Sequence, residues 1–180
     1  MSVWLDRDTQ TGPLAGIRVV DLTRTTPGPY ASMLLADLGA DVVVIEAPTG
    51  TFVTRSVDTE ERERRRAYNP LGRNKRSIVV NLKTDEGRDI VHTLARDADV
   101  FLEGFRPGIV DGLGVGYPQI AATNARGVYA SLSGYGQTGR FCQNSGLIDD
   151  RFTPSACRRL RRAHVLDQLP PPRDEHLPPR

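Results

Sequence analysis

Short apolar runs alternate with segments of helical periodicity along most of the chain. The runs are rich in β-branched residues and predict strands over 17–22, 42–45, 77–81, 100–102 and 127–132. Between them, apolar residues recur at helical spacing over 31–38, 90–95 and 119–123, which predicts helices. Strands that are apolar on both faces and alternate with helices form parallel sheets covered on both sides. We therefore expect an α/β fold with a Rossmann-like parallel sheet and flanking helices.

Turn and cap signals place the starts of two of these helices. Pro27-Gly28-Pro29 directly precedes the first helix, and Gly39 ends it. Thr84 is expected to cap the second helix, whose first turn carries Asp85 and Glu86 beside the positive end of the helix dipole. Both helices thus begin a few residues after a predicted strand.

Composition changes sharply near residue 150. Residues 151–180 contain seven Arg and six Pro but no Gly and no Lys, and such a proline content opposes a continuous helix or a central strand. We divide the chain into an N-terminal extension over 1–12, a domain over 13–146 and a disordered Pro/Arg-rich tail over 147–180. The chain has 22 Arg and only two Lys, which suggests a GC-rich gene. Our hypothesis is that the tail is a frameshift product or a natural truncation, and a disordered linker is the alternative.

Charge and cysteine content argue against several classes of protein. The 24 basic and 22 acidic residues give a net charge of +2, so no overall field favours nucleic acid or a membrane. Glutamates interleave the arginines over 62–66, and no aromatic platform accompanies those over 158–162. No run approaches the roughly 18 apolar residues of a membrane span, and Cys142 and Cys157 form no metal motif. We expect a cytoplasmic protein without a metal site, a nucleic-acid partner or a membrane anchor.

Polar and basic residues flank the predicted strands. In a parallel sheet, ligands bind beyond the carboxyl ends of the strands, where helix N-termini favour anions. Guanidinium groups bind phosphate, and a glycine allows a ligand to approach the backbone closely. We therefore expect this edge to bind a ligand that carries several phosphates and a long thin arm. The candidate binding residues are Thr25, Thr26, Pro27, Arg73, Lys75, Leu82, Lys83, Gly104, Phe105 and Arg106.

Six segments follow one another in an order typical of one enzyme family. They are 14–22, Pro27-Gly28-Pro29, 35–43, Asn74-Lys75-Arg76-Ser77, Phe105-Arg106-Pro107-Gly108 and Ser133-Gly134-Tyr135-Gly136-Gln137-Thr138-Gly139. Over 13–146 the chain resembles the family III CoA-transferases, the carnitine and bile-acid CoA-transferase group that includes α-methylacyl-CoA racemase. The resemblance implies a CoA-binding Rossmann-like domain, CoA transfer between carboxylic acids, coenzyme A bound as the substrate thioester, and an interlocked homodimer.

The resemblance also implies roles at the candidate edge. By position, Thr25 and Thr26 would pass near CoA. Leu82 and Lys83 would border the adenosine. The pantetheine and phosphates would be lined by Gly104, Phe105 and Arg106. A solvated turn is the alternative for Arg73, Lys75 and Arg76, and core packing is the alternative for Phe105. Ala47 stands where many relatives have Arg, which removes one adenine or phosphate contact.

The catalytic residues that the resemblance implies are missing. The racemases use a Gly-His-Asp segment beyond the Gly-Gln-Thr-Gly turn and a later Asp as bases on opposite faces of the substrate. In the transferases the later Asp attacks the thioester. Here Leu147 and Ile148 occupy the His and Asp positions, and the pair Asp149-Asp150 is typical of a solvated turn. We predict no catalytic residue and an inactive chain. Transferase or racemase ancestry, and the acyl group, stay open.

Two other classes of protein are alternatives to this interpretation. A dinucleotide oxidoreductase needs Gly-x-Gly-x-x-Gly after the first strand, where this chain has a threonine-rich loop over 23–26. A non-catalytic CoA-binding or interaction module stays open, because the binding residues are present while the bases are not.

Overall fold

A five-stranded parallel sheet forms the centre of the protein. The structure, a computed structural model, describes residues 3–6, 10–48 and 69–144. Within these ranges the strands are β1 (Arg18–Leu22), β2 (Asp41–Glu46), β3 (Lys75–Val79), β4 (Val100–Glu103) and β5 (Val128–Ser131). Their spatial order is β3-β2-β1-β4-β5, and every neighbouring pair is parallel. The expected α/β fold with a parallel Rossmann-like sheet is therefore confirmed.

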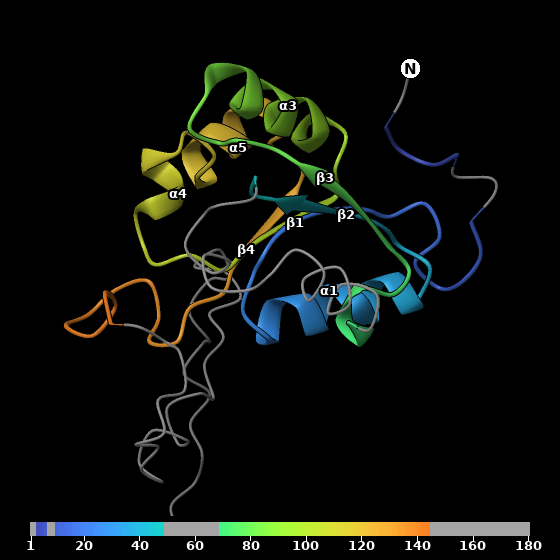
Figure 1. Cartoon of the computed structure of the whole chain (residues 1–180), viewed down its shortest axis with the longest axis horizontal. Coiled ribbons are helices and arrows are strands. Elements are labelled where there is room, and N and C mark those ends of the chain that lie inside the picture. Colours follow the sequence, from blue (N-terminus) through green and yellow to red (C-terminus); the bar gives the residue numbers. More distant parts are fainter. Residues whose placement is uncertain (1–2, 7–9, 49–68, 145–180) are drawn as a thin grey trace, which may run out of the picture.

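Helices cover both faces of this sheet (Figure 1). One face carries α1 (Pro27–Asp37), and the other carries α3 (Asp85–Arg96), α4 (Ile109–Gly112) and α5 (Tyr117–Thr123). A 3₁₀ turn, η2 (Pro70–Gly72), leads into β3 and contacts α1. In the strand order, the direction of the connections changes between β1 and β4. In doubly wound sheets this switch point is where ligands bind, at the carboxyl ends of the strands.

Two apolar clusters hold these layers together. The larger cluster joins Val20, Val43 and Phe101 of the sheet to Val91 of α3 and Ile120 of α5. The smaller cluster lies on the opposite face, where Val19, Val42 and Leu102 pack against Ala36 of α1. Successive strand residues point to opposite faces, so a run of consecutive apolar residues fills both clusters. The continuous apolar runs of the sequence are explained by this two-sided burial.

The sequence-based helices and strands agree with the structure except at three places, one of which is that α1 begins at Pro27, so that Pro27-Gly28-Pro29 forms its first turn instead of preceding it. Thr84 caps α3 as expected, with its hydroxyl accepting from the Gly87 N–H at 3.2 Å. The short helix α4 was not predicted, and β3 begins at Lys75 rather than at residue 77. The earlier start of β3 places two basic side chains inside the strand, where Lys75 pairs with Asp21 of β1 and Arg76 pairs with Asp41 of β2.

Two of the described residues before position 10, Trp4 and Leu5, contact the domain. Trp4 is 7% exposed and belongs to the larger cluster, with the Arg18 guanidinium 5.7 Å from its ring centroid. The Leu5 N–H donates to Asp41 at 2.8 Å. The tail over 147–180 lies outside the described residues. Among the helices that the structure describes, none is long and apolar enough to cross a membrane.

Candidate functional site

The loops that follow β1 and β4 touch one another at the carboxyl edge of the sheet. A Cβ atom built on Gly104 would lie 3.6 Å from the Thr23 Cβ, which is ordinary van der Waals contact. The Arg24 guanidinium lies 5.4 Å from the centroid of the Phe105 ring, in cation–π geometry. Thr25, Thr26 and Arg106 are exposed beside this contact. The two loops therefore form one continuous surface at the switch point of the sheet.

The β1–α1 loop is held from below by a buried carboxylate. Asp21 is fully buried, and its Oδ1 accepts hydrogen bonds from the Thr23 N–H at 2.8 Å and the Thr23 hydroxyl at 2.5 Å. Its Oδ2 accepts a hydrogen bond from the Ser32 hydroxyl on α1. A Cβ on Gly28 would lie 2.2 Å from the Thr23 Cβ, so only glycine fits in the first turn of α1. Loop and helix start are thus fixed to the strand.

A second buried carboxylate organises the β4 side of the edge. Glu103 is 2% exposed and accepts hydrogen bonds from the Phe105 N–H at 2.8 Å and from the Ser131 hydroxyl of β5. The Ser131 hydroxyl in turn accepts from the Gln137 side chain at 2.6 Å, which ties in the Gly-Gln-Thr-Gly turn. Burial raises the pKa of the Glu103 carboxyl above its ordinary value, although these hydrogen bonds oppose the shift. Sequence reasoning missed this residue, although an acidic residue directly after an apolar run was the available signal.

Leu82 and Lys83 lie at the same edge, beyond the end of β3. Leu82 is buried, whereas Lys83 is exposed and its N–H donates to the Asn81 side chain at 3.1 Å. Lys83 follows β3 and Arg106 follows β4, and these two strands are three strand spacings apart, roughly 14 Å at about 4.8 Å each.

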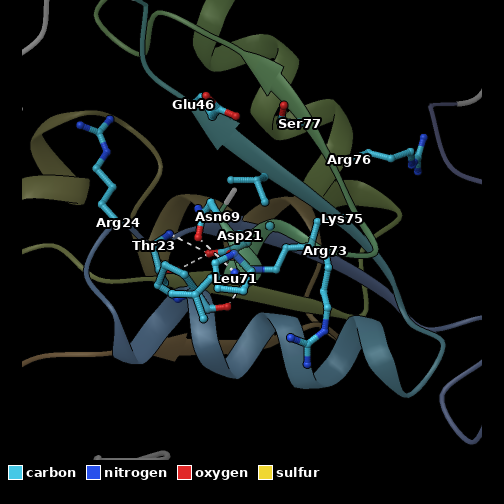
Figure 2. Close-up of a pocket in the computed structure, with 14 residues that line it drawn as sticks. Asp21, Thr23, Arg24, Glu46, Asn69, Leu71, Arg73, Lys75, Arg76 and Ser77 are labelled. Carbon is cyan, nitrogen blue, oxygen red and sulfur yellow. Dashed lines mark hydrogen bonds and ion pairs between the residues drawn. The ribbon is translucent and has the colours of Figure 1, made fainter. Parts of the chain in front are cut away.

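Arg73 and Lys75 do not join the other candidate residues at the carboxyl edge. Both precede or begin β3, at its amino end. The Arg73 guanidinium pairs with Asp37 at the C-terminal end of α1, where it is the main cause that lowers the pKa of that carboxyl. The Lys75 side chain is 3% exposed and reaches under the sheet towards Asp21. Figure 2 shows these two side chains pointing in different directions.

A cavity of about 690 Å³ opens on the α1 face of the sheet, beside the carboxyl edge. Figure 2 shows Lys75 directed towards Asp21 within it, while Arg76 points away. Thr23, Arg24 and Glu46, which also line it, end or follow β1 and β2 and so connect the cavity to the carboxyl edge. Over the described ranges, no three His, Cys, Asp or Glu side chains come together as metal ligands do.

Known proteins share this arrangement. The sequence profile of CoA-transferase family III matches residues 14–150. The human succinyl-CoA:glutarate CoA-transferase is 41% identical over 139 residues, which are 74% of this chain and 31% of that protein. The human α-methylacyl-CoA racemase is 40% identical over 134 residues, again 74% of this chain and 31% of that protein. The chain spans about a third of the length of these curated relatives.

Solved structures agree with the sequence comparison. A CAIB/BAIF family protein from Brucella suis superposes with a TM-score of 0.60 and 34% identity, over 76% of this chain and 37% of that one. The Mycobacterium tuberculosis protein Rv3272 gives a TM-score of 0.63 and 34% identity, over 77% of this chain and 37% of that one. The parallel sheet, the loops at its carboxyl edge and these matches all agree. The chain belongs to CoA-transferase family III.

Proposed function

We propose that this chain is the coenzyme A-binding portion of a family III CoA-transferase and that its carboxyl edge binds the CoA part of an acyl-CoA thioester. The observation that carries the proposal is the close approach of the β1–α1 loop to the β4 loop, where Thr23 lies beside Gly104 and Arg24 lies over the Phe105 ring. This contact lies at the switch point, where doubly wound sheets bind ligands. The relatives that the chain matches are named for CoA transfer or for an acyl-CoA substrate.

Each part of the edge suits one part of coenzyme A. The exposed side chains of Lys83 and Arg106 are charged donors suited to phosphate. The loop over Thr25, Thr26 and Pro27 leads into α1, whose positive dipole end favours an anion. Gly104 has no side chain, so the thin pantetheine chain approaches the backbone beside Phe105 and the buried Leu82. The separation of Lys83 and Arg106 favours a ligand of this length over a small carboxylic acid.

The reaction proposed for the whole enzyme is CoA transfer between two carboxylic acids. Proton abstraction at the carbon next to the thioester carbonyl, as in a racemase, is the second candidate, because the human racemase and the human transferase are matched about equally well. Leu147 and Ile148 stand where the racemases have a base, and aliphatic side chains accept no proton. We therefore propose that this chain binds CoA thioesters without turning them over. A non-catalytic CoA-binding module has the same binding edge. The interlocked homodimer and the cytoplasmic location stay predictions.

Thermal unfolding and calorimetry with coenzyme A test the proposal. A ligand that binds only the folded state stabilises it by RT ln(1 + [L]/Kd), about 2.7 kcal/mol at a hundredfold excess over Kd. We expect Tm to rise at millimolar CoA, and Arg106→Ala to weaken binding about tenfold, as loss of one charged hydrogen bond does. Arg126→Ala is the matched control, because Arg126 is also exposed but precedes β5 at the opposite edge. An unchanged Tm at millimolar CoA contradicts the proposed function.

A further inference from the structure

The ammonium group of Lys75 is enclosed by groups of the β1–α1 segment. Its Nζ donates to the Pro29 carbonyl at 2.8 Å and to the Ser32 hydroxyl at 2.6 Å. It lies 3.7 Å from the Asp21 Oδ2, and the Lys75 side chain is only 3% exposed (Figure 2). Burial lowers the pKa of this ammonium group, and the Asp21 charge opposes the shift. The Lys75 ammonium group thus donates its hydrogen bonds to groups of the protein itself, although Lys75 lines the cavity.

These contacts connect three elements that the ligand edge depends on. Lys75 belongs to β3, Asp21 to β1, and Pro29 and Ser32 to α1. Asp21 also binds both the N–H and the hydroxyl of Thr23, which lies beside Gly104 on the β4 loop. Loss of the Lys75 ammonium group therefore removes two contacts that hold the loop in place, one to the Pro29 carbonyl and one to Asp21.

We propose that Lys75 is a positioning residue for the β1–α1 loop: it acts on coenzyme A only through Asp21, Ser32 and the Pro29 carbonyl, and makes no contact with the ligand. The inference rests on the proposed function for its effect on CoA binding, but its effect on the loop stands by itself. Lys75 thereby differs from Lys83 and Arg106, whose exposed side chains are the proposed phosphate contacts.

The neighbouring residue supplies a matched control. Arg76 also belongs to β3 and also pairs with a buried carboxylate, Asp41, at 2.6 Å. Asp41 begins β2 and binds the Leu5 N–H, so this pair lies at the amino edge, away from the ligand loops. Lys75→Met and Arg76→Met each leave one buried carboxylate without its cation, yet only the first of these pairs holds the β1–α1 loop.

Hydrogen–deuterium exchange of the full chain separates a local from a general effect. In Lys75→Met we expect the amides between Thr23 and Ser32 to exchange at least about tenfold faster than the change in global stability alone explains, while those of β4 and β5 change only by the global factor. In Arg76→Met we expect the loop amides to change only by the global factor of that variant. Acceleration spread evenly over the sheet in Lys75→Met, or equal loop acceleration in both variants, overturns the inference. Ser32→Ala is the milder second variant, and it should accelerate the same loop amides even where Lys75→Met folds too poorly to measure.

Calorimetry with coenzyme A then tests the link to binding. We expect Lys75→Met to weaken CoA binding about tenfold or more, Ser32→Ala to weaken it by less, and Arg76→Met to stay within about twofold of the wild type. Wild-type affinity in both Lys75→Met and Ser32→Ala overturns the positioning role. Absence of CoA binding by the wild-type chain contradicts the proposed function instead, and the exchange experiment still decides whether Lys75 positions the loop.

Discussion

The Lys75 ammonium group lies 3.7 Å from the Asp21 carboxylate, and both side chains are buried. Their strands, β3 and β1, are separated by β2, so the pair spans the α1 face of the middle strand. A buried ion pair has a large desolvation cost, and its net contribution to stability is small when every group is satisfied. What it provides here is a fixed connection between the edge strand and the loop that leads into α1.

Lys75→Met should destabilise the fold strongly, because it leaves Asp21 buried without its cation. Removal of one partner of a buried pair costs about 3–5 kcal/mol, and we expect a loss of that order in the free energy of unfolding measured with urea. Asp21→Asn should cost a similar amount. The double variant should lose much less than the sum of the two, since neither charge is left unpaired. Additive losses would show that the two charges are not coupled.

Gly28→Ala should destabilise the protein and weaken CoA binding together. The added Cβ would lie 2.2 Å from the Thr23 side chain, so either α1 or the loop must move. Overpacking of this kind costs roughly 1–3 kcal/mol. Gly72→Ala is the control, because no atom lies within 4 Å of a Cβ at that position. Equal urea midpoints for the Gly28 variant and the wild type would contradict the close approach.

Stability should depend on pH through Glu103. Burial raises its folded-state pKa above the ordinary 4.5, so the folded protein binds more protons than the unfolded chain between these two values. The stability contributed by protonated Glu103 is present below about pH 4.5 and is lost as the pH rises through the folded-state pKa. The free energy of unfolding of wild type minus that of Glu103→Gln should therefore fall as pH rises over this window. Parallel pH curves for the two proteins would exclude the effect.

The pH dependence of stability that comes from Asp37 has the opposite sign to that from Glu103. The neighbouring Arg73 holds the pKa of the Asp37 carboxyl below its ordinary value of 3.8, so its contribution is present above that pH and is lost on acidification. We expect Asp37→Asn to abolish that acid-side loss, and added salt to reduce it in the wild type, since the pair is exposed to solvent. If the wild type and Asp37→Asn lose the same stability on acidification, the loss comes from other carboxylates.

Arg73→Ala should leave CoA affinity within about twofold of the wild type. Its guanidinium is bound by Asp37 at the C-terminal end of α1, away from the loops that carry Thr26 and Arg106. Arg106→Ala should weaken binding about tenfold by calorimetry at low salt, with a smaller effect at high salt. A tenfold loss in Arg73→Ala would instead support the sequence-based prediction that Arg73 contacts the ligand.

Apart from α4, the order of the elements and the parallel sheet could be predicted from the sequence, as could the placement of seven candidate residues at the carboxyl edge. The reason is local: apolar runs such as 42–45 are buried on both faces, and Thr84 with its acidic neighbours marks the start of α3. Thr25, Thr26, Leu82, Lys83, Gly104, Phe105 and Arg106 follow strands in the sequence, and the structure places all of them at the carboxyl edge.

The partners of the charged residues were decided by the tertiary structure alone. In the sequence Lys75 stands in a basic stretch that predicts a solvated or phosphate-binding loop, whereas its strand register places it opposite Val42 and within reach of Asp21, 54 residues earlier. Glu103 likewise depends on Ser131, which becomes its neighbour only because β5 pairs with β4. The apolar periodicity of the sequence predicts which face of a strand each side chain lies on. A hydrogen bond or ion pair between distant strands is determined only by the register of the sheet, which brings the two side chains together.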